Sequence, residues 1–191
     1  MPNGKTHDLI TLASSPIIAV GSTAILQSIV PTASILTSAA LTTAGFLFAG
    51  LMLSPDLDLH SRPYKRWKFL RWIWIPYQKA LSHRSFWSHG PLVGTSLRVL
   101  YLSLWIAGFI VGWIVLWSLF ESLSSSHGDW IKMTDTRLRF SAKALIDAIV
   151  NHIPEVLTIG VGLELGSASH YLADWISTIA KRLKKSRSSW K

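Results

Sequence analysis

The sequence contains no cysteine, so this 191-residue chain can form neither disulfides nor thiolate metal sites. Acidic residues are also scarce, with 10 Asp and Glu against 19 Lys and Arg. Charged residues make up only 15% of the chain, where about 25% is usual for soluble domains. Because so few charges are available to cover a soluble surface, the composition favours a membrane protein. Any metal must be bound through nitrogen and oxygen.

The longest stretch without charge covers residues 9–55, and Pro31 divides it near its middle. Each half is long enough to cross a bilayer, which takes about 20 residues. We therefore predict an all-α, multi-span helical membrane domain over 1–191, with interfacial or amphipathic helices beside about four transmembrane helices. The predicted spans are 9–30, 33–54, 92–120 and 156–178, and an amphipathic helix is expected at 138–150, ending before Pro154.

Basic residues concentrate in the loop 59–90 and in the C-terminal tail 181–191. The net charge of +9 could indicate nucleic acid as a partner, but both basic segments adjoin apolar runs, which favours anionic lipid. By the positive-inside rule, the loop, the tail and the N-terminus are expected on the cytoplasmic side. Within the loop, the segment WKFLRWIWIPY is predicted to be a helix lying at the membrane interface.

Imidazole and carboxylate groups gather at the predicted cytoplasmic ends of all four spans. His170 and Asp174 are spaced i to i+4, so they share one helix face and can bind one cation together. We predict a one- or two-metal site at the cytoplasmic membrane edge, holding zinc in preference to manganese or iron. The candidate ligands are His7, Asp56, Asp58, His60, His83, His89, His170 and Asp174.

Two metals about 3.5 to 4 Å apart suit the hydrolysis of a phosphoester, which is the predicted reaction. Asp58 is a candidate base or orienting group, and Arg84 is placed to orient a phosphate. The expected partners are membrane lipid and an anionic phosphoester substrate, with phospholipid as one option. No specific nucleic acid is expected, because most of the ten tryptophans fall in spans or at interfaces.

Alternatives remain for each cluster and for the whole chain. Asp56 could simply end a span, and His83 and His89 could be interfacial anchors. Glu164 could be a helix-packing partner or a proton carrier. The protein could also be a non-enzymatic membrane protein that binds metal for structure, sensing or transport, or a soluble helical enzyme with buried core helices. The segment NGKT lacks the upstream glycine of a phosphate-binding loop, and no G-x-S-x-G motif of serine hydrolases occurs.

Four motifs occur in a fixed order: T-H-D near the N-terminus, PDLD with a following His, H-R-S-x-x-S-H-G, and S-H-x-x-x-D. This order resembles a family of predicted bacterial membrane-bound metal-dependent hydrolases, including the cyanobacterial "metal-binding protein" group. That family is distantly similar to zinc-dependent phospholipases C and to zinc nucleases that cut single strands. The resemblance implies ligands from Asp56 or Asp58, His83 or His89, and His170 with Asp174. It also implies the bacterial inner (plasma) membrane, or the thylakoid membrane of a cyanobacterium, as the location.

Overall fold

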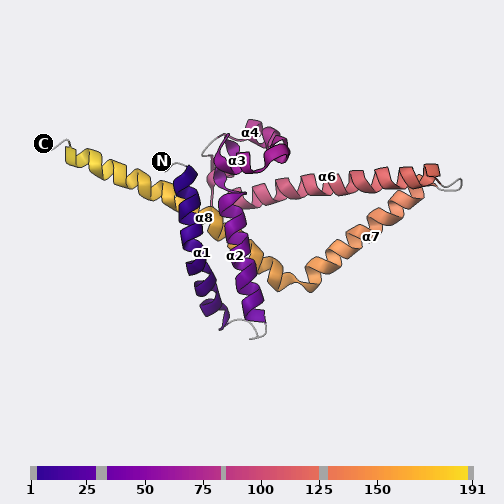
Figure 1. Cartoon of the computed structure of the whole chain (residues 1–191), viewed down its shortest axis with the longest axis horizontal. Helices are drawn as coiled ribbons and strands as arrows, with labels where there is room; N and C mark the ends of the chain where they lie inside the picture. The colour runs from indigo at the N-terminus through magenta and orange to yellow at the C-terminus, as the bar shows by residue number, and fades with distance from the viewer. Residues whose placement is uncertain (1–3, 29–33, 83–84, 125–128, 189–191) are drawn as a thin grey trace. The chain divides into compact units, whose positions relative to one another are not determined.

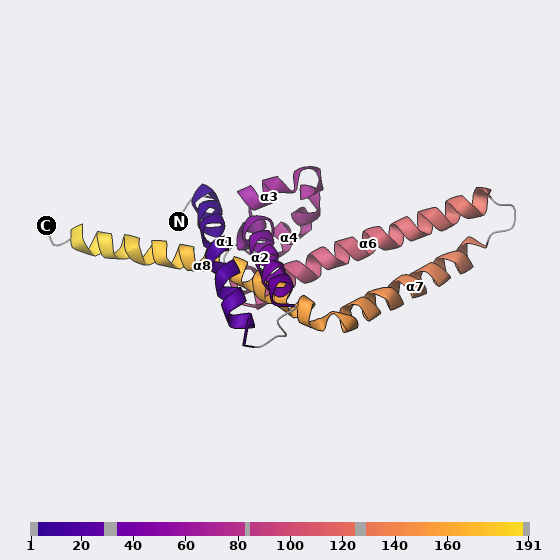
Figure 2. The ribbon, with the colours of Figure 1, turned by 60° about the horizontal axis from the view of Figure 1, so that its bottom comes forward.

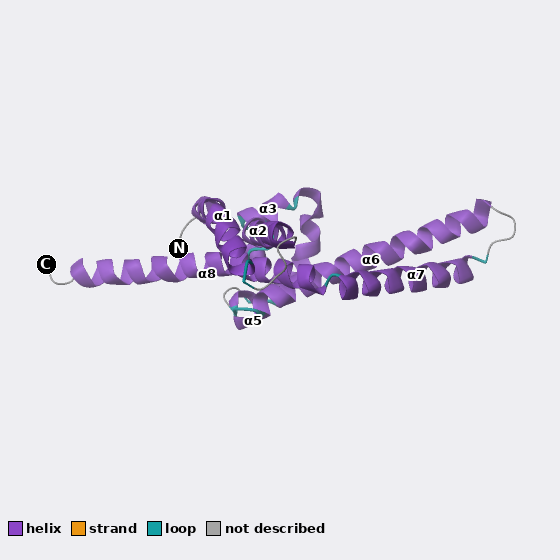
Figure 3. Cartoon of the chain, turned by 90° about the horizontal axis from the view of Figure 1, so that it is seen from below, coloured by secondary structure: helices purple, strands orange, loops and turns teal. Residues whose placement is uncertain are grey.

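A computed structural model of the chain describes residues 4–28, 34–82, 85–124 and 129–188. All regular secondary structure in these ranges is helical, which confirms the prediction of an all-α fold (Figure 3). The chain divides into two compact units, one formed by 1–99 with 157–191 and the other by 100–156. The single domain expected over 1–191 stays a prediction.

The first unit is built around three long helices. In two views α1 and α2 lie side by side, and α8 passes close to both (Figures 1 and 2). Short helices follow α2 before the chain enters α6, and both α6 and α8 continue into the second unit. The elements are α1 (Gly4–Leu26), α2 (Ile35–Leu51), η2 (Pro55–Asp58), α3 (Arg62–Arg66), η3 (Lys68–Trp74), α4 (Ile75–Ala80), α5 (Phe86–His89), α6 (Val93–Ser124) and α8 (Ile153–Ser188).

Glycines allow α8 to contact the backbone of α2. A Cβ atom added at Gly162 would lie 2.1 Å from the carbonyl oxygen of Thr42, and one at Gly166 would lie 2.3 Å from that of Phe46. Small residues four apart permit this kind of close helix contact, which is common between helices in membranes. The contact fixes the position of α8 against the C-terminal half of α2, close to the segment that carries Asp56.

The segment after α2 covers that helix's C-terminal end. Arg66 Nη1 donates to the carbonyl oxygen of Leu51 and Trp67 Nε1 to that of Met52, which satisfies carbonyl groups that a helix end leaves open. Trp74 is fully buried and contacts Trp67 edge to face. The segment predicted as an interfacial helix is helical, as η3 and α4, and Phe69 and Trp72 are exposed on it; its place at a membrane interface stays a prediction.

Helix positions agree with the predictions better than helix ends do. Spans predicted at 9–30 and 33–54 correspond to α1 and α2, while the link at Pro31 lies outside the described residues. The amphipathic helix is longer than the predicted 138–150: α7 runs over Trp130–Asn151, and Asp129 caps it by accepting hydrogen bonds from two backbone N–H groups. As expected, the chain breaks before Pro154, and α8 begins at Ile153.

Within the described residues, three helices are long and apolar enough to cross a membrane, namely those at Gly4–Leu26, Ile35–Asp58 and Val93–Ser124. The predicted span 156–178 is not a candidate span by itself. α7 and α8 reach the length and hydropathy of a span only as a pair, with a bend of 82° between them. The apolar run of α8 is interrupted by Glu155, Glu164 and Asp174.

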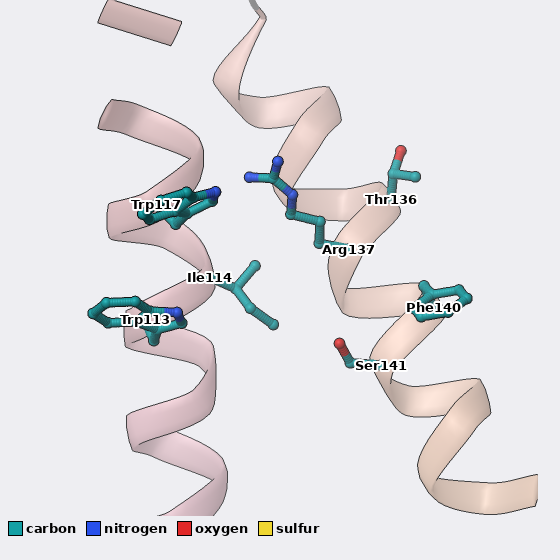
Figure 4. Close-up of a pocket in the computed structure, with 7 residues that line it drawn as sticks. All are labelled: Trp113, Ile114, Trp117, Thr136, Arg137, Phe140 and Ser141. Carbon is teal, nitrogen blue, oxygen red and sulfur yellow. The ribbon is translucent and has the colours of Figure 1, made fainter. Parts of the chain in front are cut away.

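The second unit is a hairpin of α6 and α7. Arg137 of α7 forms an ion pair with Glu121 of α6 and donates to the hydroxyl of Ser118 at 3.0 Å. Beside Arg137 lies a cavity of about 350 Å³, lined largely by Trp113, Trp117 and Phe140 (Figure 4). No histidine or carboxylate is among its described lining residues, so this cavity is not a candidate for the predicted metal site.

Candidate metal centre

Two histidines and one aspartate from opposite ends of the chain come together in the first unit. His7 lies in the first turns of α1, while His170 and Asp174 lie one turn apart on α8. Their ligand atoms all lie within 4.8 Å of one another, and His7 Nε2 is 3.3 Å from Asp174 Oδ1. The rings of His7 and His170 stack with centroids 3.8 Å apart. These three residues form a group that could hold a metal ion.

Asp56 and His89 extend this group on the side of η2 and α5. Asp56 Oδ1 lies 3.3 Å from His170 Nε2 and 4.0 Å from His89 Nε2. Asp58 Oδ2 lies 3.7 Å from the other ring nitrogen of His89, Nδ1. The 3₁₀ turn of η2 begins at Ser54-Pro55 and brings both carboxylates to the same side of the chain as His89.

Two histidines of this group each contact a different buried serine through Nδ1. Ser54 Oγ lies 3.1 Å from His170 Nδ1, and Ser88 Oγ lies 2.8 Å from His89 Nδ1. Both serines are fully buried, and Ser54 Oγ also accepts the backbone N–H of Asp56. When Nδ1 donates to a fixed oxygen, the lone pair is on Nε2 and the ring orientation is set. Both histidines then present Nε2 towards Asp56.

Buried atoms without hydrogen bonds mark the centre of the site. Within the described part of the chain, His7 Nδ1, Asp56 Oδ1, His170 Nε2 and Asp174 Oδ1 are buried and make no hydrogen bond. Each such atom costs about 1–3 kcal/mol when nothing binds it. A divalent cation would satisfy several of them at once, and a nitrogen and oxygen donor set without sulfur suits zinc, manganese or iron. The residues present therefore fit a metal.

Asp8 was not among the predicted ligands, and the structure gives it another role. Its Oδ2 lies 2.6 Å from Arg62 Nη1 and 2.7 Å from Arg66 Nη2. Asp8 itself is buried, while Arg62 is half exposed. This ion pair attaches the start of α1 to α3 and so holds His7 in place. In the sequence, an acidic residue at the start of a predicted helix and a basic loop elsewhere in the chain are the pattern that could have indicated it.

Glu164 is a helix-packing partner in this structure. Its Oε1 accepts a hydrogen bond from the backbone N–H of Leu92 and another from the hydroxyl of Tyr171, each at 3.0 Å. Leu92 has a φ of 60°, a left-handed conformation that strains a residue with a side chain. Glu164 therefore stabilises the turn between His89 and α6.

The remaining predicted site residues lie elsewhere. His60 is exposed and stacks on Tyr64 with ring centroids 4.9 Å apart, so the structure does not bring it into the group. His83 and Arg84 lie outside the described residues. The structure thus brings together six of the predicted ligand residues from four separate segments: His7, Asp56, Asp58, His89, His170 and Asp174.

A buried group of histidines and carboxylates in a helical fold fits a metal-binding protein without thiolate ligands. The chain belongs to the family described as "Uncharacterized metal-binding protein (DUF2227)", whose family model matches residues 2–184. It is also similar to an "Uncharacterized protein" of Aquifex aeolicus (strain VF5), with 46% identity over 59 residues. That match covers 30% of this chain and 41% of the relative, so the chain spans less than half of the relative's length. No solved structure gives a significant match.

Proposed function

We propose that this protein is a membrane-bound hydrolase of phosphoesters that depends on a divalent metal, with zinc as the first candidate. The observation that supports this proposal is the arrangement of two adjacent sets of groups. His7, His170 and Asp174 form a ligand set, and Asp56, Asp58 and His89 lie directly beside it. A metal-binding protein without a reaction would need the first set alone.

Within this proposal, His7, His170 and Asp174 hold the metal. When bound there, the metal would supply Lewis-acid polarisation of the phosphoester. His89 would act first as general base: its Nε2 takes a proton from the water whose oxygen bonds to phosphorus, and Asp58, which lies 3.7 Å from Nδ1, stabilises the resulting imidazolium. His89 would then return the proton to the leaving alkoxide oxygen as the old P–O bond breaks. Asp58 thus has the orienting role of a carboxylate behind a catalytic histidine. Arg84 as a phosphate-binding residue stays a prediction.

We further propose that the three candidate spans and the bent pair Trp130–Asn151 with Ile153–Leu183, as a fourth crossing, span the bacterial inner membrane, or a thylakoid membrane, with the site on the cytoplasmic side. The basic loop 59–90 supports this orientation. Arg62 and Arg66 lie at the same end of α1 as His7, so the candidate centre adjoins cations that attract anionic lipid headgroups.

Two apolar grooves between α1 and α8 support a phospholipid as the substrate. They have volumes of about 500 and 610 Å³, and Ile17, Ile18 and Leu165 line both, so the grooves are continuous. The larger one reaches Leu172 and Ala173, on the helix turn between His170 and Asp174. An acyl chain in this groove would leave its phosphate at the candidate metal centre.

The test is a phosphodiesterase assay on detergent-purified full-length protein. Bis(p-nitrophenyl) phosphate and phospholipid vesicles are each offered with zinc, manganese or iron, to wild type, His170→Ala and His89→Ala. We expect metal-dependent hydrolysis by wild type, loss of metal and activity in His170→Ala, and retained metal with lost activity in His89→Ala. Metal binding without hydrolysis of either substrate would contradict the enzymatic proposal.

A structural role for the metal is the second candidate. The ligand set joins α1 to α8, and residues of both helices line the apolar grooves. A metal at this point would stabilise the helix contact without any reaction. In that case His89→Ala would bind metal and have the same thermal stability as wild type, and neither protein would hydrolyse a phosphodiester.

A further inference from the structure

Arg98 is a buried cation that the proposed reaction does not use. It is the only Asp, Glu, Lys or Arg between residues 85 and 120, and its side chain is 1% exposed. A charge inside an apolar segment is costly, so such a residue normally has a specific role. Burying a guanidinium is tolerated only when its N–H groups find acceptors. Its hydrogen bonds therefore indicate what Arg98 does.

The two ends of the guanidinium contact two different segments. Nη1 donates to the backbone carbonyl oxygen of Ser88 at 2.6 Å. Nη2 donates to Ser167 Oγ at 3.1 Å and to Thr95 Oγ1 at 3.3 Å. All three acceptors are neutral oxygens of buried residues. Arg98 thus connects α5, where Ser88 lies, to α8, where Ser167 lies.

Two of these contacts, those to Ser88 and Ser167, lie close in sequence to a histidine of the candidate site. Ser88 precedes His89 and also contacts His89 Nδ1 through its own hydroxyl. Ser167 lies one helical turn before His170 on α8. The guanidinium therefore joins the short segment that carries His89 to the long helix that carries His170.

Gly94 allows the first turn of α6 to lie close to Ser88. A Cβ atom added at Gly94 would lie 2.7 Å from the carbonyl oxygen of Ser88 and 3.3 Å from Arg98 Nη1. Only glycine lets the first turn of α6 approach Ser88 this closely. Tyr77, also buried, interacts with Arg98 as well; burial is the main cause that raises the pKa of its hydroxyl, so Tyr77 stays neutral beside the cation.

We propose that Arg98 is a positioning residue that holds His89 opposite Asp56 and His170. α5 spans only Phe86–His89, so it has too few internal hydrogen bonds to fix the His89 side chain by itself. The planar guanidinium reaches Ser88 and Ser167 at the same time, which the single ammonium of a lysine does not reproduce. This role rests on the proposed function only in giving His89 its catalytic task; the placement of His89 is independent of it.

The test uses ¹⁵N-histidine NMR of metal-free full-length protein in detergent, with resonances assigned by single histidine variants. In Arg98→Met and Arg98→Lys we expect the His89 ring signals to shift and broaden while those of His170 stay in place. Arg137→Lys is the matched control, since Arg137 also joins two helices by hydrogen bonds but lies in the second unit. Unchanged His89 signals in Arg98→Met would overturn the proposal.

A second variant decides the question if Arg98→Met does not fold. Ser167→Ala removes only one of the two contacts, and we expect it to shift the His89 signals in the same direction by a smaller amount. Ser177→Ala is its control, because Ser177 Oγ bonds only within its own helix, to the carbonyl oxygen of Asp174. Ser167→Ala and Ser177→Ala spectra with identical His89 signals would also overturn the proposal.

If wild type hydrolyses a phosphodiester, kcat is the last quantity to measure. We expect Arg98→Lys to lower kcat by about 10-fold or more, as loss of a supporting contact commonly does, with metal affinity unchanged. The double variant Arg98→Lys/His89→Ala should be no slower than His89→Ala, since Arg98 acts through His89. Additive losses would show a general structural effect and overturn the proposal. A wild type without activity would count against the proposed function alone, because the NMR comparison needs no turnover.

Discussion

The imidazole rings of His7 and His170 stack with their centroids 3.8 Å apart, although the two residues are separated by most of the chain. Asp174 lies beside both rings, 3.3 Å from His7 Nε2 and 4.0 Å from His170 Nε2. A cation at this point would join α1 to α8.

Metal should therefore stabilise the fold. For a metal at 100 times its Kd, mass action gives about 2.7 kcal/mol of added stability. We expect zinc to raise the Tm of wild type in detergent and a chelator to reverse the change. His7→Ala should show no metal-dependent Tm, while His152→Ala, an exposed histidine of the second unit, should behave as wild type. Equal responses of all three proteins would contradict this prediction.

Removing the Ser54 hydroxyl should weaken metal binding without removing any ligand. Ser54 Oγ lies 3.1 Å from His170 Nδ1 and so sets the ring orientation. We expect Ser54→Ala to lower metal affinity by about 10- to 100-fold, the usual effect of losing a partner of a metal-binding histidine. Competition with a coloured chelator measures this. Ser15→Ala, which loses a hydroxyl bonded within its own helix, should leave the affinity unchanged.

Adding a methyl group at the contact of α2 and α8 should destabilise the protein. In Gly162→Ala the new Cβ would lie 2.1 Å from the carbonyl oxygen of Thr42, so the two helices must separate. We expect a loss of about 1–3 kcal/mol, typical of overpacking, measured as a lower Tm in detergent. Gly160→Ala is the matched control, because nothing lies within 4 Å of its added Cβ.

Gly160→Ala should even be slightly stabilising, since alanine favours helices over glycine by up to about 1 kcal/mol. A Tm that falls equally in Gly160→Ala and Gly162→Ala would show that α8 does not contact α2 as described. Metal affinity should fall in Gly162→Ala as well, because separation of α8 from α2 moves His170 away from Ser54.

Blocking the apolar groove should affect lipid substrates alone. Ser14 lines the larger groove between α1 and α8, whereas its neighbour Ser15 does not. We expect Ser14→Phe to lose hydrolysis of long-chain phospholipid but to keep hydrolysis of bis(p-nitrophenyl) phosphate. Ser15→Phe should keep both activities. Equal phospholipid hydrolysis by the two variants would exclude this groove as the acyl-chain site.

Local patterns in the sequence predicted part of this site, and the reason is geometric. The i to i+4 spacing of His170 and Asp174 places them on one helix face whatever surrounds that helix. PDLD after an apolar run indicated where α2 ends and carboxylates begin. The closeness of His60 to Asp56 in sequence also predicts that His60 is a ligand. The structure instead places its ring against Tyr64, away from the site.

Other parts of the site depend on contacts between remote segments. Ser54 and Ser88 carry no sequence signal of their own, because serines are common in this chain and only burial beside a histidine distinguishes these two. The pairing of Asp8 with Arg62 depends on the contact of α1 with α3, which the sequence does not predict. Arg98 stands out in the sequence as a lone charge in an apolar stretch. Its partners cannot be predicted in the same way, because they lie on two other helices.

The most direct measurement is the metal content of detergent-purified full-length protein by mass spectrometry, comparing wild type with His170→Ala. His60→Ala serves as control, because His60 is exposed and stacks on Tyr64. The proposed centre predicts stoichiometric divalent metal in wild type and in His60→Ala, and its loss from His170→Ala. A wild type that neither contains nor takes up metal, or a His170→Ala protein that retains it fully, would contradict the proposed centre.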